Sequence, residues 1–169
     1  MEIIRFDEHR LRKKTKKVKA FDQELKLFIE GMKELMVKSE GVGLAAPQAG
    51  DYRRAFVFVD VKTGKIREII NPVIAEKSLD KSVSEEGCLS FPNLFLNIER
   101  SKEVEVEGYD TEGNKIRIKG EGIMARILQH EIDHLDGILF FDRLPFFKRI
   151  KFKYKNRGFN RFINKKGLS

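Results

Sequence analysis

The residues best suited to chemistry lie together in one short segment, His130-Glu131-Ile132-Asp133-His134. On a helix, side chains four residues apart share a face, so the two imidazoles would reach one divalent ion. Glu131, beside the first histidine, would then be placed to act on a water molecule at that ion. The alternative explanation is that two surface histidines have this spacing by chance. The chain has only three histidines and two are in this segment, which weighs against chance. The segment therefore predicts a metal-dependent hydrolase with Glu131 as its acid–base group.

A catalytic zinc-type site needs a third protein ligand and one open position. In one class of protease this ligand is a further histidine, but position 140, where it would lie, is Phe. In another class it is a downstream glutamate, but no Glu follows Glu131. Among the later aspartates, Asp133 and Asp136 are too close along the helix to complete the site. Both common protease arrangements therefore lack a ligand.

Cys88, the only cysteine, is the upstream candidate for the third ligand. A thiolate binds borderline and soft ions well, so Cys88 and the two histidines make a shell with one open position. A buried thiol is the plain alternative, and a nucleophile with a histidine base is another. The nucleophile leaves the histidine pair and Glu131 without a joint purpose, so we favour the metal ligand. A Cys-His-His shell suits iron, zinc, nickel or cobalt.

The elements that must position these residues are helices and short strands. A helix is expected from the N-cap residue Asp22 to before Gly41, because its apolar residues recur at a spacing of three and four. A second helix, over about 121–135 and ending at Gly137, would carry the histidine pair. Strands are expected at 55–60, 67–70, 72–77, 103–110 and 114–120, the last two forming a hairpin.

This order of elements predicts an α+β fold: short, mostly antiparallel strands packed around a central metal-binding helix, with an N-terminal and a C-terminal helix. Length and composition predict one soluble domain over residues 1–169, with 41% hydrophobic and 36% charged residues. No apolar run approaches the ~20 residues of a membrane-spanning helix. The N-terminus turns charged too early for a secretory signal, so a cytoplasmic location is expected.

The net charge of +8 comes from the C-terminal segment 143–169, which has ten basic residues and no acidic ones. The first 142 residues hold the other 24 basic and all 26 acidic residues, a balance of −2. The segment mixes aromatic and basic residues, and we expect it to be partly helical. It is either a solvated tail or a dock for phosphate-rich nucleic acid.

Three segments in this order resemble the signature motifs of the peptide deformylase family: 41–48 (GVGLAAPQ), 86–90 (EGCLS) and 129–135 (QHEIDHL). The resemblance spans about residues 41 to 142. It implies a compact α+β enzyme that hydrolyses the formyl group from the N-terminal N-formylmethionine of newly synthesised proteins and releases formate. It also implies ferrous iron as the ion. Unlike many relatives, the chain has no Pro before Leu11-Arg12, which affects a local turn and not the chemistry.

The resemblance assigns further roles around the reacting carbon. The Gln48 side-chain amide and the Leu89 backbone N–H would stabilise the oxyanion together with the ion, because donors aimed at developing charge bind the transition state best. Glu86 would form a wall near the substrate. The acid–base glutamate would take a proton from the attacking water and return it to the leaving amine. Asp133 and Arg100 would form an ion pair that supports the metal helix.

The substrate needs partners for its main chain and an apolar slot for its methionine. Val42 and Gly43 are expected to pair with an extended peptide, since glycine allows close approach of the backbone. A tight turn is the plain alternative. Ile123 and Ile127 share the helix face of His130 and would line the slot, although ordinary core packing explains Ile123 nearly as well.

The basic segment gains a candidate partner from the resemblance. An enzyme acting on nascent chains benefits from sitting on ribosomal RNA, so we expect the segment to bind the ribosome and no membrane. Two other interpretations stay open. A metalloprotease cutting internal bonds would leave 41–48 and 86–90 without a role. A basic RNA-binding protein with a structural metal would need a fourth ligand, for which His9 is a candidate.

Overall fold

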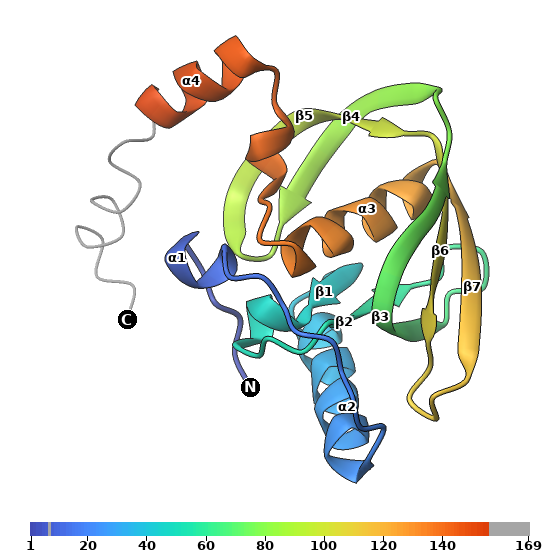
Figure 1. Ribbon diagram of the computed structural model, residues 1–169. Helices are drawn as coiled ribbons and strands as arrows, with labels where there is room; N and C mark the ends of the chain where they lie inside the picture. Colours follow the sequence, from blue (N-terminus) through green and yellow to red (C-terminus); the bar gives the residue numbers. More distant parts are fainter. Residues whose placement is uncertain (7, 156–169) are drawn as a thin grey trace.

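The strands form two antiparallel sheets, which the computed structural model describes over residues 1–6 and 8–155 (Figure 1). The strands are β1 (Gly43–Ala45), β2 (Ala55–Val59), β3 (Ile66–Lys77), β4 (Lys81–Cys88), β5 (Phe91–Ser101), β6 (Glu103–Tyr109) and β7 (Lys115–Glu121). Five of them pair in the order β1-β2-β3-β6-β7, and β4 pairs with β5 separately. All of these pairings are antiparallel, as the sequence predicted.

Helices precede, follow and connect the strands of the described chain. They are α1 (Glu8–Leu11), α2 (Gln23–Lys38), α3 (Ile123–Leu135) and α4 (Phe146–Lys155), with the 3-10 turns η1 (Ala46–Ala49) and η2 (Phe140–Arg143). Asp22 caps α2 by accepting a hydrogen bond from the Leu25 N–H at 3.0 Å, which confirms the predicted start. Gly137 follows α3 with a φ of 71°, and a β-carbon there would lie 2.3 Å from the carbonyl oxygen of Arg12.

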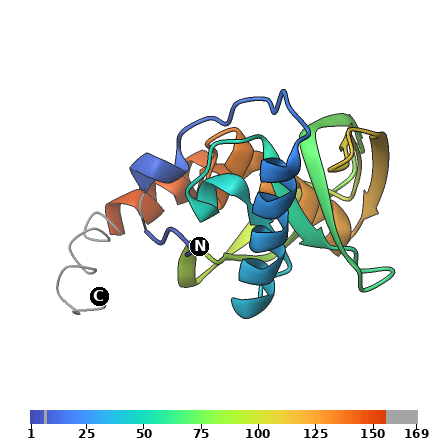
Figure 2. The same cartoon turned by 90° about the horizontal axis from the view of Figure 1, so that it is seen from below.

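The two long helices of the core cover opposite faces of the five-stranded sheet (Figures 1 and 2). Strand β2 shows why, because its residues alternate between two hydrophobic clusters. Phe56 and Phe58 pack in the cluster that contains the apolar face of α3. Ala55 and Val57 pack in the cluster that contains α2. Strand β2 is therefore apolar at every position, since neither of its faces meets water.

The ribbon of β4 and β5 crosses the other side of α3, so this helix lies between the two sheets (Figure 1). A third apolar cluster joins the ribbon to the segment after α3, and it includes Phe91, Ile98, Phe140 and Phe141. Two layers of strands therefore enclose α3, the central helix that carries the histidine pair.

The strand expected at 67–70 and the one at 72–77 are a single strand, β3, and the prediction of two strands was wrong. A register shift between Ile70 and Val73 accommodates Pro72, which has no N–H to give to a ladder. Asn71, with a φ of 53°, directs its side chain out of the ladder to the backbone N–H and carbonyl of Val18 at 2.8 and 2.9 Å. In the sequence, Asn71 and Pro72 look like a break between two strands, whereas in the structure they form a bulge within one strand.

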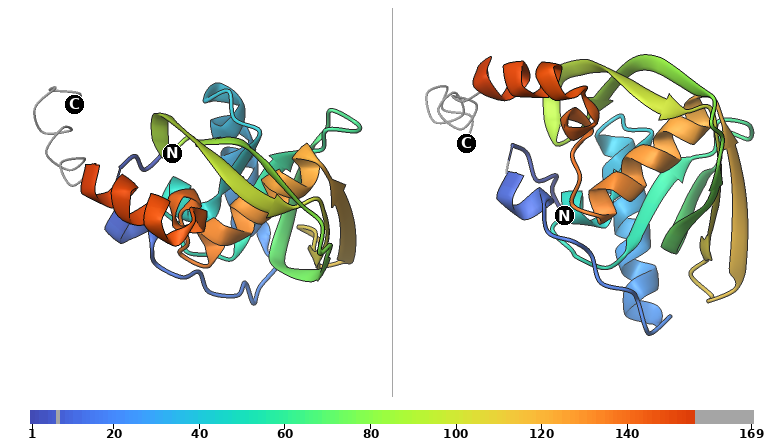
Figure 3. Two further views of the ribbon diagram at one scale, coloured as in Figure 1. Left: turned by 90° about the horizontal axis from the view of Figure 1, so that it is seen from above. Right: turned by 45° about the horizontal axis from the view of Figure 1, so that its top comes forward.

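Helix α4 carries the first part of the basic C-terminal segment and confirms that it is partly helical. It lies at the edge of the molecule, away from α2 and the five-stranded sheet (Figures 1 and 3). Residues 156–169, the rest of the segment, lie outside the described residues. Among the described helices, none combines the length and the apolar character that crossing a membrane requires.

Candidate metal centre

Three candidate metal ligands converge between the β4–β5 ribbon and α3. Cys88 ends β4, and its Sγ lies 3.2 Å from Nε2 of His134. His130 and His134 lie one turn apart on α3, with ring centroids 5.0 Å apart. One donor atom from each of the three residues lies within 4.8 Å of the others. We call Cys88, His130 and His134 the donor triad.

The donor triad fits a divalent metal ion of the borderline or soft class. One thiol and two imidazoles supply three protein ligands and leave a position open, as catalytic sites do. The His134 Nδ1 and the Glu131 Oε2 are buried without a hydrogen-bond partner among the residues that the structure describes. Burial, and then the charge of His130, hold the pKa of His134 well below its ordinary value. The ring is therefore neutral, the form that binds a metal.

His130 is oriented by a carboxylate behind it. Its Nδ1 donates to Oε2 of Glu86 at 3.1 Å, which leaves Nε2 directed at the triad. Burial alone would lower the pKa of His130, but hydrogen bonds with Cys88 and Glu86 outweigh it and raise the pKa well above the ordinary value. Such a carboxylate partner fixes the ring orientation of a metal-ligating histidine.

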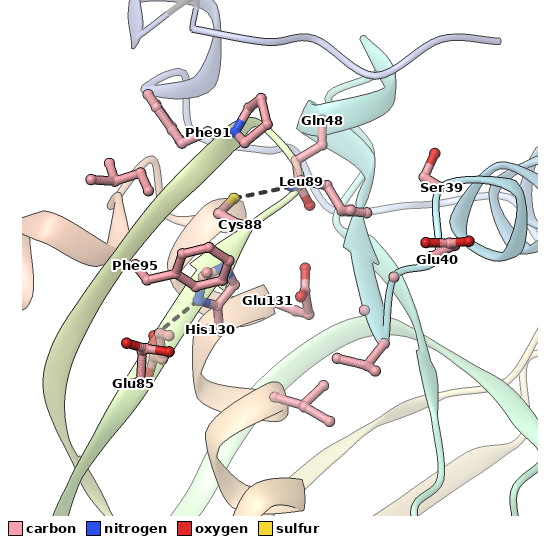
Figure 4. A pocket seen from close by; sticks show the side chains of 18 of the residues that line it. Ser39, Glu40, Gln48, Glu85, Cys88, Leu89, Phe91, Phe95, His130 and Glu131 are labelled. Atoms are coloured by element: carbon pink, nitrogen blue, oxygen red, sulfur yellow. Dashed lines mark hydrogen bonds and ion pairs between the residues drawn. The ribbon is translucent and has the colours of Figure 1, made fainter.

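Glu131 lies next to the triad with its carboxyl group facing the cavity (Figure 4). Its side chain is buried, and burial raises its pKa to about 7, although the positive charge of His130 opposes the rise. A carboxyl group with a pKa near neutral pH exchanges protons efficiently in both directions. The position and the pKa of Glu131 both suit an acid–base group.

A buried ion-pair network supports this part of α3. Arg100 donates to both carboxylate oxygens of Glu86, at 2.9 and 3.0 Å, and also to Asp133. Hydrogen bonds from His130 and Arg100 overcome the cost of burial and lower the pKa of Glu86 far below its ordinary value. The expected ion pair between Arg100 and Asp133 is present. Arg143, just after α3, also binds Asp133.

Gln48 and Leu89 lie beside Cys88 (Figure 4). The Gln48 side chain is anchored at its oxygen, which accepts the Ala45 N–H at 2.8 Å. Its amide nitrogen therefore points the other way, 3.5 Å from Sγ of Cys88 and 3.2 Å from Oγ of Ser90. Leu89 follows Cys88 in the turn between β4 and β5. Both predicted oxyanion donors are placed at the edge of the triad.

A cavity of about 510 Å³ opens onto the triad. The predicted substrate residues all line it, namely Val42, Gly43, Glu86, Ile123 and Ile127. Ile123 is 63% exposed at the mouth and Ile127 is 6% exposed deeper in the cavity. Glu86 lines the wall, but its carboxylate is occupied by the ion-pair network. Its side chain therefore orients His130 as well as bordering the cavity.

Sequence reasoning missed the contribution of β5 to this cavity. Leu94 and Phe95 line it, and the ring of Phe95 covers the backbone of Gly87 (Figure 4). Part of the signal was present, because Leu94, Leu96 and Ile98 recur at every second position, but the apolar Phe95 between the first two hides the alternation of a half-buried strand. His9, in contrast, is exposed on α1 and does not belong to the donor group found in the described chain.

Comparisons with known proteins agree on one family. The family model described as polypeptide deformylase matches residues 1–150. The peptide deformylase of Thermotoga maritima is 48% identical over 145 residues, covering 86% of this chain and 87% of that protein. The chloroplastic peptide deformylase 1B of rice, Oryza sativa subsp. japonica, is 40% identical over 85% of this chain and 55% of its own length.

Solved structures give the same result for the fold. The crystal structure of peptide deformylase from Thermotoga maritima matches with a TM-score of 0.81 at 46% identity, covering 85% of this chain and 97% of that one. The Arabidopsis thaliana peptide deformylase 1B, solved in complex with an inhibitor, matches with a TM-score of 0.89 at 34% identity, covering 99% and 95%. The fold of this chain is thus that of those proteins.

Proposed function

This chain belongs to the polypeptide deformylase family, and we propose that its donor triad holds the metal ion on which the reaction depends. The enzyme removes the formyl group from the N-terminal N-formylmethionine of newly synthesised proteins by hydrolysis and releases formate. The observation that carries the assignment is the convergence of one thiol and two imidazoles within 4.8 Å, beside the buried carboxyl group of Glu131.

Glu131 is the group that moves protons. When bound, a divalent ion at the triad supplies Lewis-acid chemistry, lowering the pKa of water toward neutrality and polarising the formyl carbonyl. Glu131 accepts a proton from the water that attacks the formyl carbon and then gives it to the amine that leaves. The cavity walls hold water away from the carboxyl group, and this burial keeps its pKa near 7, where it serves both steps.

Gln48 and Leu89 act on the formyl oxygen as it gains negative charge. The Ala45 N–H holds the Gln48 amide at its oxygen, so the N–H₂ group stays directed toward Cys88 and Ser90 at the edge of the donor triad. The backbone N–H of Leu89 is fixed by the β4–β5 turn. Donors that are in place before the reaction need no reorganisation when the charge develops, which is why they favour the transition state.

The cavity binds the formylated peptide in extended form. Strand β1 is an edge of the five-stranded sheet, and Gly43 offers backbone groups at that edge. Val42, whose carbonyl accepts the Val59 N–H at 2.9 Å, lies just before β1 and borders the peptide. The methionine side chain enters the deeper part, where Ile127 and the aliphatic wall beside His130 give it an apolar surface. Ile123, at the mouth, and the wall residue Glu86 border the slot.

The ion in the cell is ferrous iron on this proposal. A Cys-His-His shell also binds zinc, nickel or cobalt. The metal found in purified protein is therefore expected to depend on how the protein was prepared. Metal analysis after anaerobic and aerobic purification separates the cases. Iron in the anaerobic sample, together with faster formate release, supports the assignment, and equal zinc in both samples contradicts it.

The C-terminal segment 143–169 docks the enzyme on the ribosome, and the whole chain forms one domain that works in the cytoplasm, where its substrates are made. The support is electrostatic and structural. The exposed Lys148 and Lys151 lie on α4, at the edge of the molecule, among the exposed aromatic residues Phe147 and Tyr154. Basic side chains bind backbone phosphates and aromatic rings stack on unpaired bases.

Two histidine variants test the assignment of the triad. His134→Ala should lose bound metal and formate release from formyl-methionyl peptides, while His9→Ala should keep both, because His9 is exposed on α1. Neither the variants nor the wild type should cut unblocked peptides. Retention of metal and formate release by His134→Ala would show that the triad is not the site.

A further inference from the structure

The carboxylate behind the metal ligand His130 is held by two guanidinium groups, which is more than charge neutralisation requires. Glu86 accepts from Arg100 on both oxygens and from Arg126 on Oε1, while its Oε2 accepts from His130. Arg100 divides its donors between Glu86 and Asp133. Arg126 gives no hydrogen bond to Asp133 among the contacts of the described residues, and its contact with Glu86, at 2.6 Å, is the shortest of those at this carboxylate.

Arg126 joins α3 to both strands of the β4–β5 ribbon. It lies four residues before His130, on the same face of the helix, and is 7% exposed. Its Nη1 also donates to the carbonyl of Ile98 in β5 at 2.9 Å, and its Nη2 donates to the carbonyl of Ser82 in β4 at 3.0 Å. These backbone acceptors fix the guanidinium plane, so that Nη1 reaches only one of the two oxygens of Glu86.

We propose that Arg126 is a positioning residue for the metal ligand His130, acting through Glu86. Arg126 on Oε1 and the fork of Arg100 on both oxygens together hold the carboxylate against rotation, and Oε2 stays on the Nδ1–H of His130. That hydrogen bond selects the tautomer whose Nε2 is free to bind the ion. The inference rests on the proposed role of the donor triad and adds a residue that the sequence motifs did not single out.

The geometry requires arginine and not simply a positive charge. A guanidinium is a planar fork that serves Glu86, Ile98 and Ser82 at once, whereas a lysine ammonium is a point charge on a flexible stem. Arg126→Lys should therefore keep the fold and much of the ion pairing but release the orientation of Glu86. Arg126→Met should release the orientation and also lose the charge.

Gln129 provides a matched control on the same helix. Its side chain also ties α3 to β5, through the backbone N–H and carbonyl of Ser101 at 3.2 and 2.9 Å. No hydrogen bond between Gln129 and Glu86 occurs in the described part of the chain. Gln129→Met should therefore loosen the helix–strand contact without disturbing the Glu86–His130 hydrogen bond. Thermal unfolding of each variant shows how far its fold is weakened.

The experiment measures the rate at which the zinc-loaded protein gives zinc to an excess of chelator. Loss of a carboxylate partner behind a ligand typically weakens metal binding 10- to 100-fold, so about tenfold faster release is expected for Arg126→Lys and Arg126→Met. Gln129→Met should release zinc at the wild-type rate. In the zinc-loaded protein, the ring ¹⁵N and ¹H signals of the His130 Nδ1–H group should shift in the Arg126 variants alone, because only these variants disturb its hydrogen bond to Glu86.

Each contrary result has one meaning. Wild-type release rates and an unchanged His130 spectrum in Arg126→Lys and Arg126→Met would overturn the positioning role while leaving the donor triad intact. Equally fast release from Gln129→Met would show that Arg126 acts only by tying the helix to the strand. A wild-type protein that binds no zinc would overturn the triad and the positioning role together. If Arg126→Met does not fold, Arg126→Lys decides the question.

Discussion

Gly43 leaves the space that the carboxyl group of Glu131 occupies. A β-carbon built on Gly43 would lie 2.4 Å from Oε1 of Glu131 and 2.9 Å from its carboxyl carbon. Gly43 belongs to β1 and Glu131 to α3, so this contact brings the edge of the sheet against the acid–base group. The glycine in the first motif is therefore explained by the catalytic carboxyl group as well as by backbone pairing with the peptide.

Gly43→Ala should lower the rate of formate release without removing the metal. The added methyl group forces Glu131 to move, and a shift of about 1 Å in a catalytic group can cost about a hundredfold in rate. Steady-state kinetics should therefore show a fall in kcat, with the metal content unchanged. Gly31→Ala, in the middle of α2, is the control: it meets only Met1 at 3.4 Å and should leave kcat unaltered. Wild-type kcat in Gly43→Ala would disprove the steric account.

Arg100→Met should destabilise the protein and weaken metal binding. It leaves Asp133 and Glu86 buried with fewer partners, and breaking a buried ion pair costs about 3–5 kcal/mol. Urea unfolding of the metal-free protein measures this loss. Lys81→Met is the control, because Lys81 pairs with Glu99 on the surface and such pairs contribute about 0–1 kcal/mol. Equal effects of the two changes would mean that the buried network has no special role.

Gln48→Ala should reduce kcat by about a hundredfold, which is the usual effect of losing one oxyanion donor. KM for a formyl-methionyl peptide should change little, because the amide acts mainly on charge that develops in the transition state. The metal content should be retained, since the Gln48 nitrogen lies 3.5 Å from the Cys88 sulfur and is not a ligand. A rise in KM with unchanged kcat would instead assign Gln48 to substrate binding.

Reversing two charges on α4 should weaken binding to ribosomes. Lys148→Glu/Lys151→Glu removes two exposed lysines. In a plot of the logarithm of the binding constant against the logarithm of the salt concentration, the slope should therefore become shallower by about two. Hydrolysis of short formyl-peptides should be unaffected. The double variant Lys62→Glu/Lys65→Glu, in the exposed turn after β2, has the same charge change and should bind as the wild type. Identical salt dependence in both double variants would remove α4 from the interface.

Helices α2 and α3 and the convergence of the donor triad could be predicted from the sequence. The stripe of apolar residues and the cap at Asp22 define α2, and the spacing of His130 and His134 requires a helix. Cys88 was predicted as the third metal ligand because no residue downstream of the histidine pair could serve as one. Gln48 and Leu89 were predicted from the family motifs. The Arg100–Asp133 ion pair was predicted as a support for the metal helix, and the structure contains it.

Features that depend on the tertiary structure were harder to predict. Strand β4 is mostly exposed along its length, so its sequence lacks the apolar alternation that marks a half-buried strand. The bulge at Asn71 interrupts the pattern of β3 and makes one strand look like two. Arg126 has no local signal at all, because its partners Glu86, Ser82 and Ile98 are brought to it only when the ribbon crosses α3.

The most direct test of the central claim compares the wild type with Glu131→Ala, both purified without oxygen, for bound metal and for formate release from formyl-methionyl peptides. The donor triad is intact in the variant, so both proteins should carry the metal in equal amounts. Formate release should fall by at least about a hundredfold in the variant, because the other buried carboxylate that lines the cavity in the described chain, Glu86, is held in the ion-pair network. A metal-loaded Glu131→Ala variant with near-normal formate release would contradict the account.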